Sequence, residues 1–427
     1  MFGWEFPPHI SGGLGTASYG LTKGLAKAGI EILFVMPKAS GDEDESIGKI
    51  INASDVSAKP DVFQSEYWKN VDFLKIPSGL LPYVGIEEYQ ELRTESAGSK
   101  TTVSHLGEKY LFSGKYGANL MEEVARYAMV AATIAEQEQF DIIHAHDWLT
   151  YPAGIAAKRI SGKPLVIHVH ATEFDRSGES VNQTVYDLEK TGMEEADAIM
   201  AVSNLTRNIV ISKYNIDESK VFTVHNAVDF SGYKTTSVER KLKERIVTFL
   251  GRITFQKGPE YFIEAASKVL KRIPDVRFVM AGSGDMMNRM VKRVAKLNMG
   301  SKFHFTGFLK GDEVNKMYSY SDVYVMPSVS EPFGISPLEA MRSGVPVIIS
   351  KQSGVSEVLK HAIKINFWDV DALADSIHAL LNYDGVKKMI TRCGYDEVNS
   401  FSWDDTAKMV KNIYFNTLNS FKTKLFV

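Results

Sequence analysis

The chain has 427 residues, more than one hydrophobic core usually supports, so its length predicts two domains. An apolar fraction of 44% and a charged fraction of 24% are typical of an ordinary globular protein. The formal net charge of −3 disfavours nucleic acid and anionic lipid as partners, because proteins that bind either are usually basic.

Membrane and secretion signals are absent from the sequence. No segment reaches the roughly 18 apolar residues of a membrane span, so no integral membrane segment is predicted. The N-terminus lacks a basic stretch followed by an apolar one, so we expect no signal peptide. The single cysteine, Cys393, excludes an intrachain disulfide and suits a reducing compartment. These features together predict a cytoplasmic location.

The first half of the chain alternates short β-rich runs with amphipathic helical stretches. Residues 1–6 are typical of the end of a first strand that leads into a glycine-rich turn. Further strands are expected at 31–37, 141–145, 164–170, 198–202 and 221–225, with a helix at 120–136. The irregular segment 40–115, rich in acidic and polar residues, predicts an insertion with a hairpin. The alternation predicts a parallel sheet with helices on both faces.

The alternation restarts after the turn-like and lysine-rich stretch 226–244. Strands are expected at 246–251, 277–281, 302–306, 323–327 and 345–350, with a helix at 259–272. We therefore place a domain boundary near residue 235, with an N-terminal domain over 1–235 and a C-terminal domain over 236–400. Residues 401–427 predict a helix that packs back on the first domain.

The first strand–helix turn carries Ser-Gly-Gly-Leu-Gly at residues 11–15. It matches a dinucleotide fingerprint only in part, and a lone glycine-rich turn is a weak signal. We expect its backbone to contact a phosphate or a sugar.

Two histidine-rich segments, 144–148 and 168–173, end neighbouring predicted strands. Alternating histidines could indicate a metal site, but no cysteine joins them and no metal is expected. A sugar site is the favoured interpretation.

Within these segments His170 stands at a strand tip, where it can face a reacting sugar, and Asp147 can orient an acceptor. His144 and His168 lie earlier in their strands, and we interpret both as satisfied core histidines.

Residues 251–258, Gly-Arg-Ile-Thr-Phe-Gln-Lys-Gly, follow the first strand of the second domain. Open α/β sheets bind ligands at the carboxyl ends of their strands. This position favours diphosphate binding by Arg252 and Lys257 over two incidental surface cations.

Two later strand ends are weaker candidates. Residues 281–285 fit a nucleotide contact or a tight turn equally well, and the main chain around Leu309 could line a base pocket.

The strongest signal is residues 328–340, where a strand, a glycine turn and a helix start coincide. Glu331 on the loop and Glu339 in the helix could each hold hydroxyl pairs of one extended ligand. The backbone N–H groups that open this helix are free to bind anionic or hydroxylic groups, and they belong to Phe333, Gly334, Ile335 and Ser336. A solvated loop glutamate beside an ordinary helical one is the alternative, which the coincidence of the three features disfavours.

Taken together, these motifs resemble retaining GT-B glycosyltransferases, notably glycosyltransferase family 4 and the related glycogen and starch synthases. The matching stretches are 6–15, 144–148, 168–173, 202–203, 225–229, 251–258 and 330–340. The resemblance implies an α/β fold of two Rossmann-like, doubly wound parallel-sheet domains that face a central cleft. It makes the first domain the acceptor side and the second the nucleotide-sugar-binding side, and it implies a glycan acceptor.

The resemblance also implies roles for single residues. Arg252 and Lys257 would neutralise the leaving diphosphate, Glu339 would bind the ribose and Glu331 the hydroxyls of the donor sugar. Gly13 would lie against the donor phosphate or sugar, and His170 would lie beside the reacting carbon. The same resemblance implies a UDP- or ADP-sugar as substrate, no cofactor and no metal, because cations and helix N-termini stabilise the charge.

One position departs from the pattern. Many glycogen and starch synthases that use ADP-glucose have a lysine two residues before the double glycine, where this chain has Ile10. The donor nucleotide therefore stays open. A hexose, with glucose as the best guess, passing to an α-glucan is the leading interpretation. The alternatives are another polysaccharide or glycolipid acceptor, a GT-B UDP-sugar epimerase, and a non-catalytic nucleotide-sugar or glycan binder.

Overall fold

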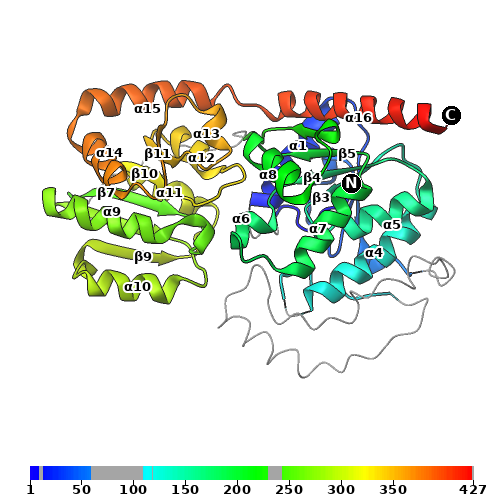
Figure 1. Cartoon of the computed structure of the whole chain (residues 1–427), viewed down its shortest axis with the longest axis horizontal. Coiled ribbons are helices and arrows are strands. Elements are labelled where there is room, and N and C mark those ends of the chain that lie inside the picture. Colours follow the sequence, from blue (N-terminus) through cyan, green and yellow to red (C-terminus); the bar gives the residue numbers. More distant parts are fainter. Residues whose placement is uncertain (9–12, 59–108, 118, 229–242, 426–427) are drawn as a thin grey trace. The chain divides into compact units, whose positions relative to one another are not determined.

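The computed structural model describes residues 1–8, 13–58, 109–117, 119–228 and 243–425, which are coloured in Figure 1. They form two compact units, Met1–Phe174 with Glu179–Ala227 and Trp403–Val427, and Asp175–Gly178 with Val228–Ser402. Residue 235, where the sequence predicts the boundary, lies outside the described residues.

The first unit is built on a parallel sheet. Its strands are β1 (Leu33–Met36), β2 (Lys49–Asn52), β3 (Ile143–His146), β4 (Leu165–Val169), β5 (Ala198–Ala201) and β6 (Val221–Thr223). β1 pairs with β2, and β3 to β6 pair in chain order. Phe2 forms parallel bridges to both Val35 and Ala145, so the predicted first strand is present as one bridging residue between β1 and β3.

The helices along this part of the chain are α1 (Gly13–Lys27), α4 (Leu120–Gln137), α5 (Tyr151–Ser161), α6 (Glu173–Ser177), α7 (Gln183–Glu195) and α8 (Asn204–Tyr214). Short 3-10 turns occupy η1 (Glu45–Ile47), η2 (Ala53–Asp55) and η5 (Glu218–Lys220). The last helix, α16 (Trp403–Leu425), belongs to the same unit.

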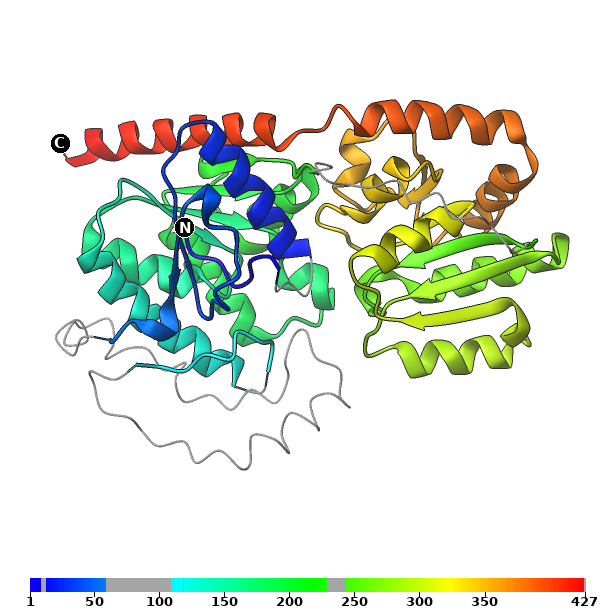
Figure 2. The ribbon, with the colours of Figure 1, turned by 180° about the vertical axis from the view of Figure 1, so that it is seen from behind.

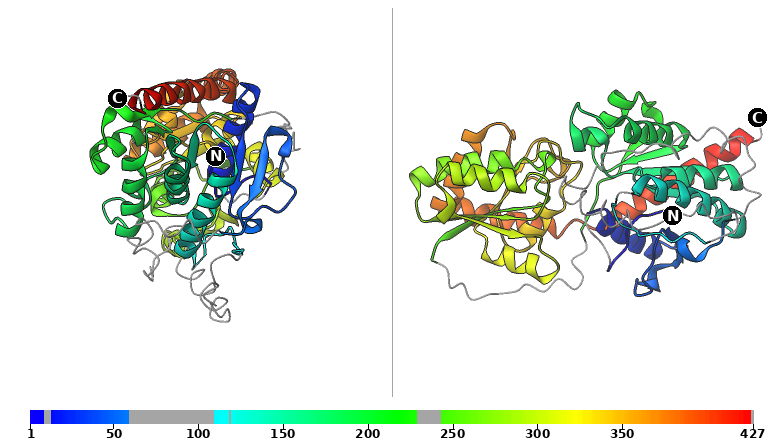
Figure 3. Two further views of the ribbon diagram at one scale, coloured as in Figure 1. Left: turned by 90° about the vertical axis from the view of Figure 1, so that its right-hand side faces the viewer. Right: turned by 90° about the horizontal axis from the view of Figure 1, so that it is seen from below.

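The two faces of the first sheet bury different residues, as the alternation of side chains along a strand requires. Ala145, Ile167 and Ile199 belong to a core that includes α4, α5 and α7. Val166 and Met200 belong to a second core with α1 and α16, the helices drawn in blue and red in Figure 3.

Helices α1 and α16 lie against each other, although almost the whole chain separates them (Figure 2). Gly20 and Gly24, one turn apart on α1, let Trp403 approach so closely that a Cβ at Gly24 would lie 2.7 Å from the Trp403 carbonyl oxygen. Lys411 donates a hydrogen bond of 2.6 Å to the carbonyl of Ala28. The C-terminal helix thus completes the core of the first unit.

The second unit contains a six-stranded parallel sheet in the order β12-β11-β10-β7-β8-β9. Its strands are β7 (Arg245–Leu250), β8 (Val276–Ala281), β9 (Phe303–Gly307), β10 (Val323–Met326), β11 (Val347–Ser350) and β12 (Ile363–Ile365). Read from β9, this is the 3-2-1-4-5-6 order of doubly wound nucleotide-binding sheets, and the direction of winding reverses between β7 and β10.

The helices of the second unit are α9 (Pro259–Arg272), α10 (Met287–Lys296), α11 (Asp312–Tyr320), α12 (Ser336–Arg342), α13 (Val355–Val358), α14 (Val370–Asn382) and α15 (Asp384–Val398), with 3-10 turns η6 (Phe255–Lys257) and η7 (Gly300–Lys302). Phe262, Phe278 and Leu380 represent its core, which joins α9 and α14 to the sheet.

Each predicted strand after residue 30 overlaps an observed one. Residues 59–108 of the predicted hairpin insertion lie outside the described residues. Within the described part of that segment, β2 pairs with β1 in parallel, and Ser57 forms an antiparallel bridge to Lys109. Among the helices that the structure describes, none is both long and apolar enough to cross a membrane.

Candidate functional site

The strongest candidate site lies where the winding of the second sheet reverses. The loop after β7 carries Lys257 and the loop after β10 carries Glu331, and the Lys257 Nζ lies 2.6 Å from the Glu331 Oε2. The two side chains are 20% and 8% exposed, so this ion pair is largely withdrawn from water. At the reversal point the neighbouring loops leave in opposite directions and open a place for a ligand.

The position of Glu331 is fixed from several sides. Its backbone N–H donates to the Gln352 carbonyl at 2.9 Å, and its own carbonyl accepts from the Gly354 N–H at 2.9 Å. Ser328 Oγ donates to the Glu331 Oε2 at 3.1 Å. The glutamate that the sequence places on a loop is therefore bonded to the neighbouring loop as a strand residue is, through a parallel bridge to Ser353.

Gly258 brings the two loops together. Its φ of 64° lies in the left-handed region, and a Cβ there would lie 2.1 Å from the carbonyl oxygen of Pro327. Only glycine lets the chain turn from η6 into α9 this close to the end of β10. This contact explains why Lys257, just before the glycine, reaches Glu331.

Glu339, the second predicted carboxylate, is half-buried in α12. The Tyr318 hydroxyl lies 3.3 Å from its Oε2 and 3.1 Å from the Ser336 carbonyl oxygen. Burial raises the pKa of Glu339, and the hydrogen bond from Tyr318 partly offsets this. Glu339 is thus oriented by a buried hydroxyl.

The remaining predicted donor residues lie in the same unit. Arg252 Nη2 donates to the Gln256 Oε1 at 3.2 Å, and Leu309 packs beside the buried cluster of Ile246, Val279 and Met317. Before α12, Phe333 is buried, while Gly334, with φ of 100°, and Ile335 are half-buried.

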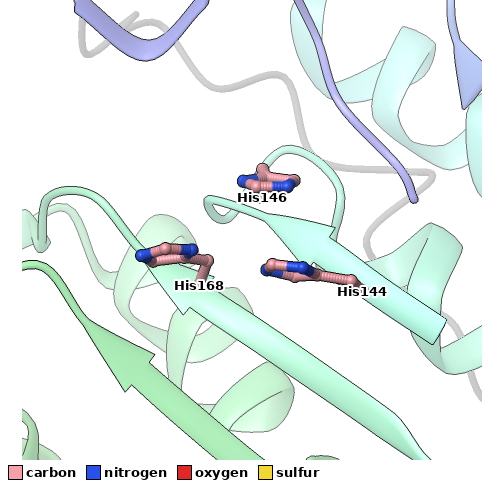
Figure 4. A group of neighbouring side chains, drawn as sticks. All are labelled: His144, His146 and His168. Atoms are coloured by element: carbon pink, nitrogen blue, oxygen red, sulfur yellow. The ribbon is translucent and has the colours of Figure 1, made fainter. Parts of the chain in front are cut away.

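The histidines predicted in the first unit form a stack. His144, His146 and His168 come from β3 and β4, where His146 pairs in register with His168, and Figure 4 shows their rings lying close together. His146 stacks on His144 at 4.2 Å and His170 on His168 at 4.4 Å between ring centroids. One hydrogen bond of 3.1 Å joins His146 Nδ1 to His170 Nε2, and another of 2.5 Å joins His144 Nδ1 to the Tyr414 hydroxyl.

Burial is the main reason that all four imidazoles have lowered pKa values. It lowers the pKa of His170 to about 3, and it holds the pKa values of His144, His146 and His168 well below their usual range, with help from the neighbouring histidines. Each ring is therefore neutral near pH 7 and carries one N–H.

His144 and His168 are both buried, as predicted for core histidines, but of the two rings only that of His144 makes a hydrogen bond within the described part of the chain, through Nδ1 to Tyr414. Neither ring nitrogen of His168, nor Nε2 of His144, has a hydrogen-bond partner among the residues that the structure describes. Strand alternation puts the rings on one face and stacks them on each other, which leaves few positions for polar partners.

The stack has some features of a metal site, because one ring nitrogen from each of His144, His146 and His168 lies within 4.8 Å of the others. Tetrahedral zinc, with Zn–N of about 2.0–2.1 Å, needs nitrogens about 3.3 Å apart. The rings of His144 and His146 are within 24° of parallel, and those of His144 and His168 within 14°. Lone pairs in nearly parallel planes do not converge on one ion, so the residues fit a metal poorly as they stand.

Asp147 directly follows β3 and adopts a φ of 64°, which is unusual for a residue other than glycine. Its N–H donates to the His168 carbonyl at 2.9 Å, and its carbonyl accepts from Thr150.

Gly13 opens α1 and has open space where a Cβ would lie. The turn residues 9–12, with Ile10, lie outside the described part of the chain.

Sequence reasoning missed three side chains that orient the predicted residues: Ser328, Tyr318 and His146. The alternation of His146 with His144, in register with His168, is a signal for the last of them. Nothing in the sequence indicates Tyr318, which lies 21 residues before Glu339.

Family models match both halves of the chain. Residues 1–220 match the model described as "Starch synthase catalytic domain", and residues 234–396 match "Glycosyl transferases group 1". An uncharacterized glycosyltransferase of Methanocaldococcus jannaschii is 29% identical over 97% of both chains. The glycogen synthase of Mycobacterium tuberculosis is 22% identical over 97% of this chain and 93% of its own.

Among solved structures, sucrose-phosphate synthase from Thermosynechococcus elongatus superposes with a TM-score of 0.69 at 18% identity, over 96% of this chain and 94% of its own. At this identity the likeness concerns the fold alone.

Proposed function

Because the chain belongs to the starch synthase catalytic domain family of glycosyltransferases, we propose that it is a retaining hexosyltransferase that acts on a nucleotide-diphosphate sugar. In this proposal a hexose, with glucose as the best guess, passes from UDP or ADP to a glycan acceptor, as in α-glucan synthesis. The family membership confirms the resemblance inferred from the sequence and the prediction that the chain is an enzyme, a glycosyltransferase.

The observation that carries the proposal is the Lys257–Glu331 pair at the reversal point of the second sheet. A cation and a carboxylate held 2.6 Å apart suit a ligand with a diphosphate next to a ring of hydroxyls. Lys257 and Arg252 would stabilise the charge on the leaving diphosphate, and Glu331 would accept hydrogen bonds from the sugar hydroxyls. Glu339, in the first turn of α12, would bind the ribose.

The residues proposed for the acceptor side belong to the first unit. His170 would lie beside the sugar that reacts, and Asp147 would orient the acceptor hydroxyl. Retention would follow from attack on the face that the diphosphate leaves, with the departing phosphate oxygen taking the proton of the acceptor hydroxyl. Such a step forms the new glycosidic C–O bond as the C–O bond to phosphate breaks, and it requires no protein nucleophile.

A donor screen tests the proposal. The purified chain is incubated with UDP- and ADP-sugars, with and without glycogen, while released nucleoside diphosphate and the anomeric configuration of the product are measured. Release that requires acceptor, with an α-linked product from an α-configured donor, supports retaining transfer. An epimerised sugar formed without acceptor would instead establish an epimerase, and release from none of the donors would contradict the proposal.

The two cations provide a second test. Arg252→Ala and Lys257→Ala should each lower turnover by roughly 10²–10³-fold, the usual loss when one fixed donor to a developing charge is removed. Lys271→Ala is a matched control, because this exposed lysine lies near the C-terminal end of α9, away from the loop. Turnover of both variants within about threefold of the parent chain would remove the pair from the site.

A further inference from the structure

The four-histidine stack contains one hydrogen bond between its own members, and it involves the residue proposed to face the donor sugar. His146 Nδ1 and His170 Nε2 are 3.1 Å apart. His146 is fully buried, whereas His170 is only half-buried. The buried ring of His146 therefore contacts the half-buried ring of His170 from the interior of the protein.

The backbone of His146 is held on both edges of its strand. Its N–H donates to the Phe2 carbonyl at 3.0 Å, and the next N–H, that of Asp147, donates to the His168 carbonyl at 2.9 Å. Its ring rests on His144, which is itself bonded to Tyr414. His146 thus has little freedom to move, and it can fix the ring that it contacts.

The direction of the hydrogen bond follows from the other nitrogen of His146. Both rings are neutral, so one of the two facing nitrogens carries the proton and the other accepts it. His146 Nε2 is buried and has no hydrogen-bond partner in the described structure. If His170 donated, His146 would have to carry its own proton on this Nε2, as a buried N–H without an acceptor, which is rare in folded proteins. If His146 donates, Nε2 is left with only an unused lone pair.

We propose that His146 is a positioning residue that donates from Nδ1 to His170 Nε2 and so holds His170 in the tautomer protonated on Nδ1. The hydrogen bond to His146 uses the Nε2 of His170 and leaves its Nδ1 for a ligand. His170 then offers a neutral N–H donor to an oxygen of the bound sugar, and it is not set up to act as a general base. The identity of the ligand rests on the proposed function, whereas the tautomer of His170 does not depend on that function.

The tautomer can be measured without any activity. In the full-length protein with 15N-labelled histidine, protonated and unprotonated ring nitrogens are distinguished by their chemical shifts. His170→Gln assigns the signals of this residue among the ten histidines of the chain. We expect Nδ1 of His170 to be the protonated nitrogen, and a proton on Nε2 would overturn the proposal.

Three substitutions at His146 test its effect on turnover. In asparagine the side-chain amide nitrogen takes the place of Nδ1, in glutamine it takes the place of Nε2, and leucine has none. His146→Gln and His146→Leu should lower kcat about a hundredfold, the loss expected from a displaced reacting group, with the donor KM changed by less than about threefold. His146→Asn should recover most of this loss.

The thermal midpoint of each variant separates positioning from folding. Equal kcat losses in all three variants with unchanged midpoints, or a kcat unaffected by His146→Leu, would overturn the positioning role. If the parent chain transfers no sugar, the proposed function fails while the nitrogen shifts still decide the tautomer.

Discussion

At the scale of single residues, the carboxylate of Glu331 is held by several neighbours. It is 8% exposed, it accepts from Lys257 and Ser328, and its backbone is bonded to the loop after β11. Glu339 differs, since it is half-buried on a helix and accepts a hydrogen bond from the Tyr318 hydroxyl. Two glutamates of one motif therefore have different environments, which predicts different effects when each loses its charge.

The first prediction compares Glu331→Gln with Glu339→Gln. If the donor sugar gains positive charge in the transition state, the carboxylate near it helps there more than in the ground state, and only such differential binding raises turnover. Glu331→Gln should therefore lower kcat by roughly 10²–10³-fold with a modest change in KM. Glu339→Gln should chiefly raise the donor KM, because a ribose contact is made equally in both states.

Steady-state kinetics with the best donor from the screen provide the measurement, and unchanged thermal midpoints provide the folding control. The reverse pattern of kcat and KM, or two folded variants with unaltered kinetics, contradicts the assignment.

The second prediction concerns acid and the histidine stack. Folding lowers the pKa of each of the four imidazoles below its unfolded value of about 6.5. Below that pH the unfolded chain binds protons that the folded chain does not, so the free energy of unfolding falls as the pH drops. The slope should approach about 1.4 kcal/mol per pH unit for each histidine, and no contribution is expected above the unfolded pKa.

Urea unfolding at about pH 7.5 and about pH 5.5 measures this slope. His170→Gln should reduce it, whereas His304→Gln, at an exposed position of β9, should not. A parent chain with equal stability at both pH values would show that the imidazoles are not held neutral.

At the scale of elements, the contact between α1 and α16 depends on glycine. A glycine inside a helix usually costs about 1 kcal/mol relative to alanine, so its presence needs a compensating contact. Gly24 has one, because a Cβ there would lie 2.7 Å from the Trp403 carbonyl oxygen and 3.0 Å from the Ala407 Cβ. Backbone atoms of a packed helix cannot rotate away as a flexible side chain can.

The third prediction follows from that contact. Gly24→Ala should destabilise the chain by roughly 1–3 kcal/mol, the usual range for an overpacked core, despite the better helix propensity of alanine. Gly385→Ala is the matched control in α15, where no atom lies within 4 Å of the added Cβ, and it should not destabilise the chain. Thermal or urea unfolding compares the two, and equal effects would mean that α16 does not pack on Gly24.

At the scale of the whole molecule, the predicted α/β architecture of two parallel-sheet domains of the GT-B type is confirmed by the structure and by its similarity to sucrose-phosphate synthase. The predicted domain limits, the site residues, the absence of a cofactor and the cytoplasmic location stay predictions. The candidate residues come from both units, and in each unit they follow the ends of parallel strands, where open α/β sheets bind ligands.

The fourth prediction concerns metal ions. Arg252 and Lys257 supply fixed positive charge to the diphosphate in the proposed mechanism, and the stacked histidines fit a metal poorly. Dialysis against EDTA should therefore leave transfer largely intact, with elemental analysis of the dialysed protein as the control. Activity that is lost on dialysis and restored by one divalent ion would contradict the prediction and revive a histidine metal site.

The sequence by itself determined the alternation of strands and helices, the strand ends and the residue types placed at them. These are local properties, since side-chain periodicity, glycine turns and helix starts depend on near neighbours along the chain. Thus 323–327 followed by Glu331, and 246–251 followed by Lys257, could be read directly from residue order.

Only the tertiary structure decided which of these strand ends meet. The pairing of β7 with β10 brings Lys257 to Glu331 across 74 positions of sequence, and the pairing of β3 with β4 brings His146 to His170. Tyr318 and Trp403 acquire their partners in the same way. Strand order is set by burying many side chains at once, and no local pattern records it, so the partners of charged and polar groups become known only when the sheet is assembled.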